Sequence, residues 1–173
     1  GAFWDTLQRC GVTLLVSREY EHLLLALSAS EGKRELSFLR MPHPSGIAFD
    51  AQRDVVHVAS TRNPNQLFEL RPVTGLRPRA GRRAVHVRGG PLIPTLIRML
   101  PGCSYVHDLA MISGRLHANA VGENVVVAFD RDGAAQPVWW PRCVEVNGVP
   151  QVDRNYLQLN SIAPGASVRD SYF

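Results

Sequence analysis

The stretch HPSGIAFDAQRDVVHVASTRNPNQLFEL, residues 43–70, holds three short apolar runs separated by turn residues. Runs of about four to eight residues, rich in β-branched and aromatic side chains and bounded by Gly, Asn, Asp, Ser or Pro, are typical of β-strands. The same cadence returns in YVHDLAMISGRLHANAVGENVVVAFD, residues 105–130. The chain therefore repeats a unit of three strands.

An alignment of the two stretches defines the repeat. When SGIAFD is placed over HDLAMI, His57 falls nearly on His117 and, after small gaps, Asn65 falls on Asn124. Both histidines lie inside apolar runs, so we expect them to be packed core residues with one hydrogen bond each.

A third copy of the unit begins at LNSIAPG, where Ile162 and Ala163 repeat the Ile-Ala pair of residues 47 and 48. The three starts are 62 and 53 residues apart, which is near the length of a propeller blade with insertions. Upstream, VTLLVS, HLLLALSAS and ELSFLR supply another strand triplet that lacks the marker residues.

These observations predict an all-β fold, a partial β-propeller with a short N-terminal helix in FWDTLQRC. We expect about three four-stranded antiparallel blades of a six- or seven-bladed ring in a single domain, residues 1–173. The approximate blades are 11–42, 43–104 and 105–159, and residues 160–173 begin the next blade.

Three blades cannot close a ring by themselves, because they would leave apolar faces and a strand edge in water. The sequence allows three interpretations of this. One interpretation is that the chain is a fragment of a longer protein. A second is a natural half-propeller that closes with another copy or a second chain, so that the partner supplies the remaining blades. A third is an unrelated open β-sheet or sandwich.

Composition and charge narrow the function classes. The chain is 45% hydrophobic and 20% charged, within the range of globular proteins. It has no run of roughly 18 apolar residues and no secretion signal, so we expect a cytoplasmic protein with no membrane partner.

The three cysteines form no disulfide or zinc pattern. Six arginines within residues 71–88 predict a solvated loop, and without interleaved aromatic residues we expect no nucleic-acid partner.

Several motifs together resemble a known family: FWDTLQRCGVTLLVSREYEHLLLALS, HPSGIAFD, VHVASTRNPNQLFEL, HDLAMISGRLHANAVGENVV and YLQLNSIAPG. They are similar to an uncharacterised bacterial family of conserved hypothetical proteins, a domain of unknown function with a β-propeller-like repeat fold of the WD40 or YVTN kind. The resemblance covers essentially the whole chain and implies that this chain is a partial member. It implies no activity and brings no catalytic residues.

Polar residues precede each repeated first strand, and in a propeller such residues converge at one rim of the central funnel. A second polar group lies in the turn STRNPNQ, where Arg62 would grip a carboxylate or phosphate. The alternative is that these side chains satisfy local backbone groups. The candidate ligand-binding residues are His43, Ser45, Arg62, Asn63, Asn65, His107, Asp108 and Asn160, with Ser161 beside them.

Three functions remain open for this sequence, and one of them is a purely structural protein-interaction propeller. The first is a scaffold that binds a small molecule or a peptide in the central funnel. The second is a metal-assisted hydrolase or lyase, resembling a lactonase or a uronate lyase, with a divalent metal ion at the rim. The candidate metal ligands are His43, His107, Asp108 and Asn160.

Overall fold

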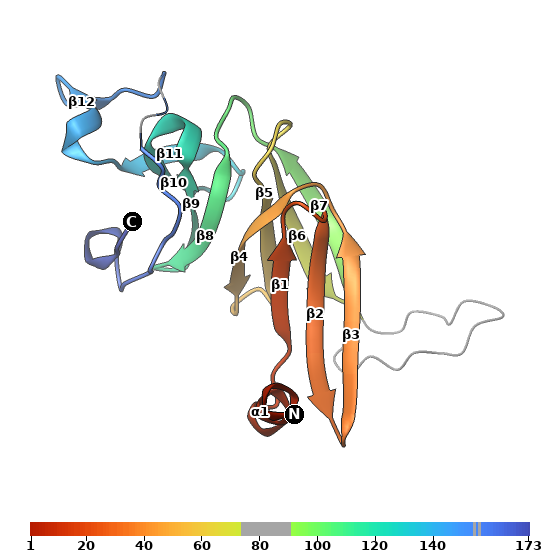
Figure 1. Ribbon diagram of the computed structural model, residues 1–173. Helices are drawn as coiled ribbons and strands as arrows, with labels where there is room; N and C mark the ends of the chain where they lie inside the picture. The colour runs from red at the N-terminus through yellow and green to blue at the C-terminus, as the bar shows by residue number, and fades with distance from the viewer. Residues whose placement is uncertain (74–90, 154, 156) are drawn as a thin grey trace.

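The computed structural model describes residues 1–173 apart from 74–90, 154 and 156. It consists of one short helix and a series of antiparallel strands (Figure 1). The elements are α1 (Ala2–Cys10), β1 (Leu14–Arg18), β2 (Leu23–Ser30), β3 (Lys33–Arg40), β4 (Pro44–Asp50), β5 (Val55–Ser60), β6 (Gln66–Pro72), β7 (Leu92–Met99), β8 (Val106–Ile112), β9 (Arg115–Ala120), β10 (Val125–Phe129), β11 (Ala135–Trp139), β12 (Glu145–Val146) and β13 (Val149–Pro150), with single 3-10 turns at Val121–Glu123, Arg142–Val144 and Val168–Asp170.

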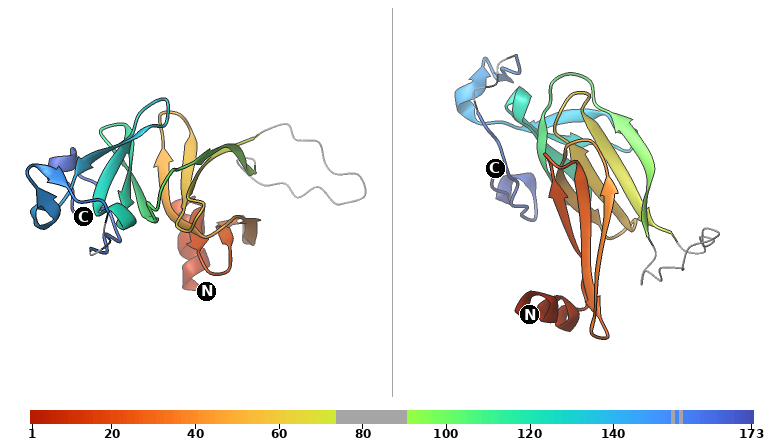
Figure 2. Two further views of the ribbon diagram at one scale, coloured as in Figure 1. Left: turned by 90° about the horizontal axis from the view of Figure 1, so that it is seen from above. Right: turned by 45° about the vertical axis from the view of Figure 1, so that its right-hand side comes forward.

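The strands form three sheets that follow one another along the chain, and a small hairpin. The first sheet is β1-β2-β3, the second is β4-β5-β6-β7, and the third is β8-β9-β10-β11. Figure 2 shows the sheets fanned side by side. The propeller-like, all-β prediction with one short helix is confirmed, although the sheets do not close into a ring.

Alternating side chains explain why the sheets stack. Along β5, Val56 and Val58 point to one face and His57 and Ala59 to the other, because side chains in a strand alternate. The valine face joins a core with Leu24 of the first sheet. The opposite face contributes to a core shared with the third sheet, and a third core lies between the third sheet and the segment after it.

In the second and third sheets the chain runs through the four strands in order, so β4 and β8 are their first strands. These two strands lie against each other, and the contact between them is very close. A Cβ built on Gly46 would lie 2.5 Å from Cα of Asp108, so only glycine allows this approach. The first strands β4 and β8 therefore meet along one line of the molecule.

One detail of the prediction changes. The first sheet has three strands instead of the expected four, since no strand lies beside β1 on its free edge within the described residues. In the second sheet the segment LIPTLIRML forms the outer strand β7, where Pro94 fits because an edge strand tolerates proline. Most of the arginine-rich segment 71–88 falls outside the described residues. Among the helices in the described part of the chain, none has the length and apolar character needed to cross a membrane.

Candidate functional site

Both first strands contain a β-bulge at the same place. Ser45 and Gly46 of β4 lie opposite a single residue of β5. His107 and Asp108 of β8 likewise lie opposite a single residue of β9, Asn119. A bulge adds a residue to one strand and re-aims its side chains, and bulges are frequent beside functional sites.

The bulge in β8 is held by a fully buried amide. Oδ1 of Asn119 accepts the backbone N–H of His107 at 3.1 Å and that of Asp108. Its Nδ2 donates to the carbonyl oxygen of Leu159. Oδ2 of Asp108 accepts the N–H of Ile162 at 2.9 Å. These bonds fix segment 159–162 alongside β8.

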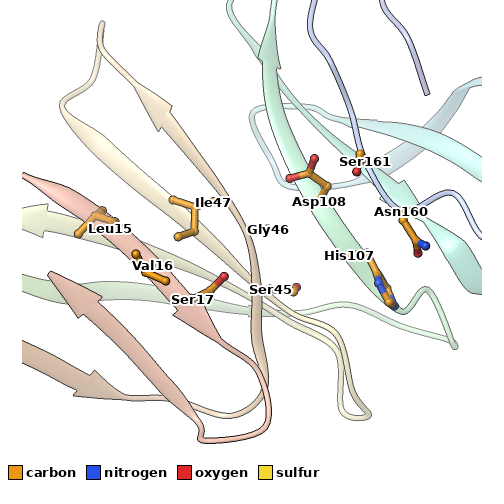
Figure 3. Close-up of a pocket in the computed structure, with 10 residues that line it drawn as sticks. All are labelled: Leu15, Val16, Ser17, Ser45, Gly46, Ile47, His107, Asp108, Asn160 and Ser161. Carbon is orange, nitrogen blue, oxygen red and sulfur yellow. The ribbon is translucent and has the colours of Figure 1, made fainter. Parts of the chain in front are cut away.

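This arrangement brings residues from distant parts of the sequence together. Figure 3 shows His107 beside Asn160, and Asp108 close to Ser161. The repeat in the sequence predicts that these four residues lie at one rim, and the structure brings them together. Oδ1 of Asp108 accepts the N–H of Leu109 at 2.9 Å, so both carboxylate oxygens are engaged by backbone amides.

Two adjoining cavities lie at this point, each of about 440 Å³. We call the first the inner groove, because it runs between β1 and the bulges of β4 and β8 (Figure 3). It is lined by Leu15, Val16, Ser17, Ser45, Gly46, Ile47, His107, Asp108, Asn160 and Ser161.

We call the second the rim cavity, because turns and connecting segments supply most of its lining. Seven of its eight lining residues carry polar groups, and none is a carboxylate. His107 and Asn160 line both cavities and so form their common wall. The rim cavity is lined by Thr61, Arg62, Tyr105, His107, Val121, Asn155, Gln158 and Asn160.

Arg62 lines the rim cavity and also belongs to an ion cluster that Glu19 forms with Arg62 and His43. Its Nε donates to Oε1 of Glu19 at 3.1 Å, and this bond raises the pKa of the guanidinium. Nδ1 of His43 lies 4.0 Å from the same oxygen, too far for a hydrogen bond. The N–H of His43 donates to Nδ1 of His22 at 3.2 Å. His43 thus lines neither cavity and lies with Glu19 instead.

The two asparagines of the STRNPNQ turn lie outside both cavities. Asn65 is fully buried, and its Oδ1 accepts the N–H of Tyr105 at 3.1 Å. Its Nδ2 donates to the carbonyl of Gly102 at 3.1 Å and to Oδ1 of Asn63 at 2.7 Å. Asn65 therefore ties the turn to the connection between β7 and β8.

The residues that were candidate metal ligands divide between two places. His107, Asp108 and Asn160 line the inner groove, while His43 belongs to the ion cluster. Within the described ranges, no three His, Cys, Asp or Glu side chains are grouped so that they could hold a metal ion.

Sequence reasoning missed part of both cavities. Tyr105, Asn155 and Gln158 reach the rim cavity from connecting segments, and residues 15–17 of β1 line the inner groove. The alignment of the repeats could have identified Tyr105, since it stands at the same position before β8 as His43 does before β4. Both residues have a positive φ, 45° and 37°.

Comparison with protein families gives one match. The family described as a domain of unknown function (DUF4915) matches residues 1–171. The chain belongs to this family. The resemblance to a family of unknown function is thereby confirmed, while a bacterial origin stays a prediction. No curated protein matches this DUF4915 chain.

Solved structures support the fold. Virginiamycin B lyase from Staphylococcus aureus is similar with a TM-score of 0.56 at 10% sequence identity, over 91% of this chain and 44% of that chain. A streptogramin B lyase is similar with a TM-score of 0.53 at 13% identity, over 79% of this chain and 38% of that one. The DUF4915 chain thus spans less than half the length of these propeller-like proteins, and at such identities the likeness concerns the fold alone.

Proposed function

We propose that this protein is a binding scaffold that holds a small molecule or a peptide in the rim cavity. The observation that carries the proposal is the convergence of Arg62, His107 and Asn160 with four other polar residues around one space of about 440 Å³. Small-molecule sites commonly occupy about 300–1,000 Å³ and use a few converging polar groups to orient the ligand.

The lining indicates the chemistry of the ligand. Arg62 is cationic and donates hydrogen bonds, and the amides of Gln158 and Asn160 supply further donors. Because the rim cavity has no carboxylate, a ligand that presents carbonyl or carboxylate oxygens fits it better than a cation. Glu19 balances Arg62 outside the cavity, so an anionic group would share the guanidinium with Glu19.

The test is a thermal-shift screen of short peptides and small carboxylates and amides, followed by calorimetric titration of the best binder. We expect His107→Ala and Asn160→Ala each to weaken that binder at least tenfold, which corresponds to about 1.4 kcal/mol. Gln136→Ala is the matched control for Asn160→Ala, because Gln136 is an exposed amide on the outer strand β11, and it should bind as the wild type does. A binder that both rim variants retain at full affinity would contradict the proposal.

The metal-assisted hydrolase or lyase is the alternative outcome of the same experiment. Incubating the binder with protein and a divalent ion, and following its mass, distinguishes the two. Unchanged mass agrees with a scaffold. Conversion that is lost in His107→Ala would replace the scaffold by an enzyme.

A further inference from the structure

Within the described residues, the first sheet has no strand that corresponds to β4 or β8. In the second sheet the chain leaves the outermost strand β7 and enters the first strand of the next sheet, β8. It likewise leaves β3 and enters β4. By this order β3, β2 and β1 are the fourth, third and second strands of a blade, so the place before β1 has no strand from the described residues.

The sequence of the β1–β2 hairpin agrees with this assignment. VSREYEHLLLAL, residues 16–27, can be aligned without gaps with ASTRNPNQLFEL, residues 59–70, which joins the second and third strands of the second sheet. The alignment places Leu24 on Leu67, and these side chains are 4% and 2% exposed. Each leucine lies in a core shared with the following sheet, which agrees with the equivalence of β2 with β6 and hence of β1 with β5.

The inner groove lies where the missing strand would run. Residues 15–17 of β1 form one wall, and residues 45–47 of β4 form part of the other (Figure 3). On its other side β4 is in contact with β8 so closely that Gly46 has no room for a Cβ. The first strand β4 thus lies against β8 and, together with β8, lines the groove that separates it from β1.

We propose that the inner groove is a docking site for an extended strand of a partner polypeptide, which pairs with the free edge of β1 and completes the first blade. An edge strand presents unpaired N–H and C=O groups that an added strand can use. Strand addition of this kind gives affinity through the main chain and specificity through alternate side chains.

The chain's own first strands define the chemistry of that partner. In β4 and β8 a bulge residue is followed by Ile or Leu and then Ala, at Gly46-Ile47-Ala48 and Asp108-Leu109-Ala110, and the segment Ser161-Ile162-Ala163 repeats the Ile-Ala pair. No lysine or arginine lines the groove, and its one carboxylate, Asp108, is held by two backbone amides. A neutral or weakly charged strand with this pattern fits the groove.

A second copy of the chain is a poor source for this strand. The equivalent segment, 159–163, is fixed at its own place by Asn119 and Asp108. At Ala163 it also exchanges two backbone hydrogen bonds with Tyr172, of 2.9 and 3.1 Å. The propeller-like structures that this chain resembles are more than twice its matched length, so their fold has room for strands beyond those of residues 1–173.

The probe is a fluorescein-labelled peptide with the sequence of residues 105–113, YVHDLAMIS, titrated with the protein by fluorescence polarisation. We expect saturable binding. N-methylation of one set of alternate amides should weaken it at least tenfold, because that edge faces β1, and N-methylation of the other set should have less than about a twofold effect. Equal effects of the two sets, or no binding at about millimolar protein, would overturn the proposal.

A pair of protein variants locates the binding. Ser17→Phe places a ring in the groove and should weaken the peptide at least tenfold. Ser37→Phe makes the same change at an exposed site on the outer strand β3 of the same sheet and should leave the affinity unchanged. Sedimentation of the protein without peptide should give a monomer. A dimer that the peptide dissociates would assign the groove to a second copy and overturn the choice of partner.

Discussion

The second and third sheets are two versions of one design, and some positions are the same in both. Asn65 and Asn124 are both fully buried. Asn65 binds the connection that leads into β8, and Asn124 does the same for the next connection: its Oδ1 accepts the N–H of Leu157 at 3.0 Å and its Nδ2 donates to the carbonyl of Gln151 at 3.3 Å. Side chains that recur between the sheets hold the fold.

Other positions differ between the sheets, and these face the cavities. At the two bulge positions the second sheet has Ser45 and Gly46, while the third has His107 and Asp108. The bulge of β4 is held by Ser45, whose Oγ donates to the carbonyl of Val106 at 2.7 Å, and the bulge of β8 is held by Asn119. The backbone shape is kept by different means, which leaves the side chains free to vary where a ligand would lie.

Gly46 gives the largest effect that this comparison predicts. Gly46→Val should lower the free energy of unfolding by about 3 kcal/mol, because the added Cβ would meet the backbone of Asp108, which cannot move aside as a flexible side chain would. Urea denaturation measures the change. At the equivalent position of the third sheet, Asp108→Val should cost less, about 2 kcal/mol, because it removes the carboxylate that accepts the N–H groups of Leu109 and Ile162 but that site already accommodates a side chain. Equal losses would show that the close approach is not what requires glycine.

The two buried asparagines should have similar, somewhat smaller effects. Asn65→Ala and Asn124→Ala should each destabilise the protein by about 2 kcal/mol, because each leaves a buried backbone N–H and a carbonyl without their partner. Asn63→Ala is the control in the same turn, since Asn63 is exposed, and its cost should stay under about 1 kcal/mol. A loss at only one of the buried positions would break the equivalence of the sheets.

The repeat explains what the sequence alone could reveal. Equivalent first strands carry polar residues at equivalent places, so Ser45, His107, Asp108 and Asn160 could be found by alignment. The bulges could not, because an extra residue in one strand is visible only against its partner strand. Asn65 was a candidate contact because it is polar and lies in a turn, but only the coordinates reveal that backbone groups use its amide.

The rest of the rim cavity comes from segments that do not repeat. Asn155 and Gln158 lie in the connection after the third sheet, which has no counterpart of similar sequence. The three-stranded first sheet escaped prediction for a related reason. Its three apolar runs looked like a blade, and the absence of the Ile-Ala marker, which reveals the missing first strand, has meaning only once the strand order is known.

The smallest predicted effect concerns the two equivalent histidines. His57 and His117 are each 3% exposed, which confirms them as core residues, and burial lowers the pKa of both imidazoles. The expected hydrogen bond is present at His117, between Nδ1 and the carbonyl of Arg115 at 3.0 Å, whereas Nδ1 of His57 is buried without a partner. At His57 the carboxylates of Glu69 and Asp50 oppose this shift without reversing it, and Arg53 and Arg71 add to it. As the pH falls through about 6.5, the unfolded chain takes up protons that the folded protein does not, so stability should fall.

Urea denaturation between about pH 7.5 and 5.5 measures this slope, because carboxylates stay mostly ionised over that range. The double variant His57→Gln, His117→Gln should have a flatter slope, whatever its absolute stability, since glutamine does not titrate. NMR titration of the two imidazoles in the folded wild type should find both still neutral at the pH where an exposed histidine is half protonated. A wild-type slope that survives in the double variant would place the titrating groups elsewhere. The two histidines would then be equivalent in position but would not cause the pH dependence of stability.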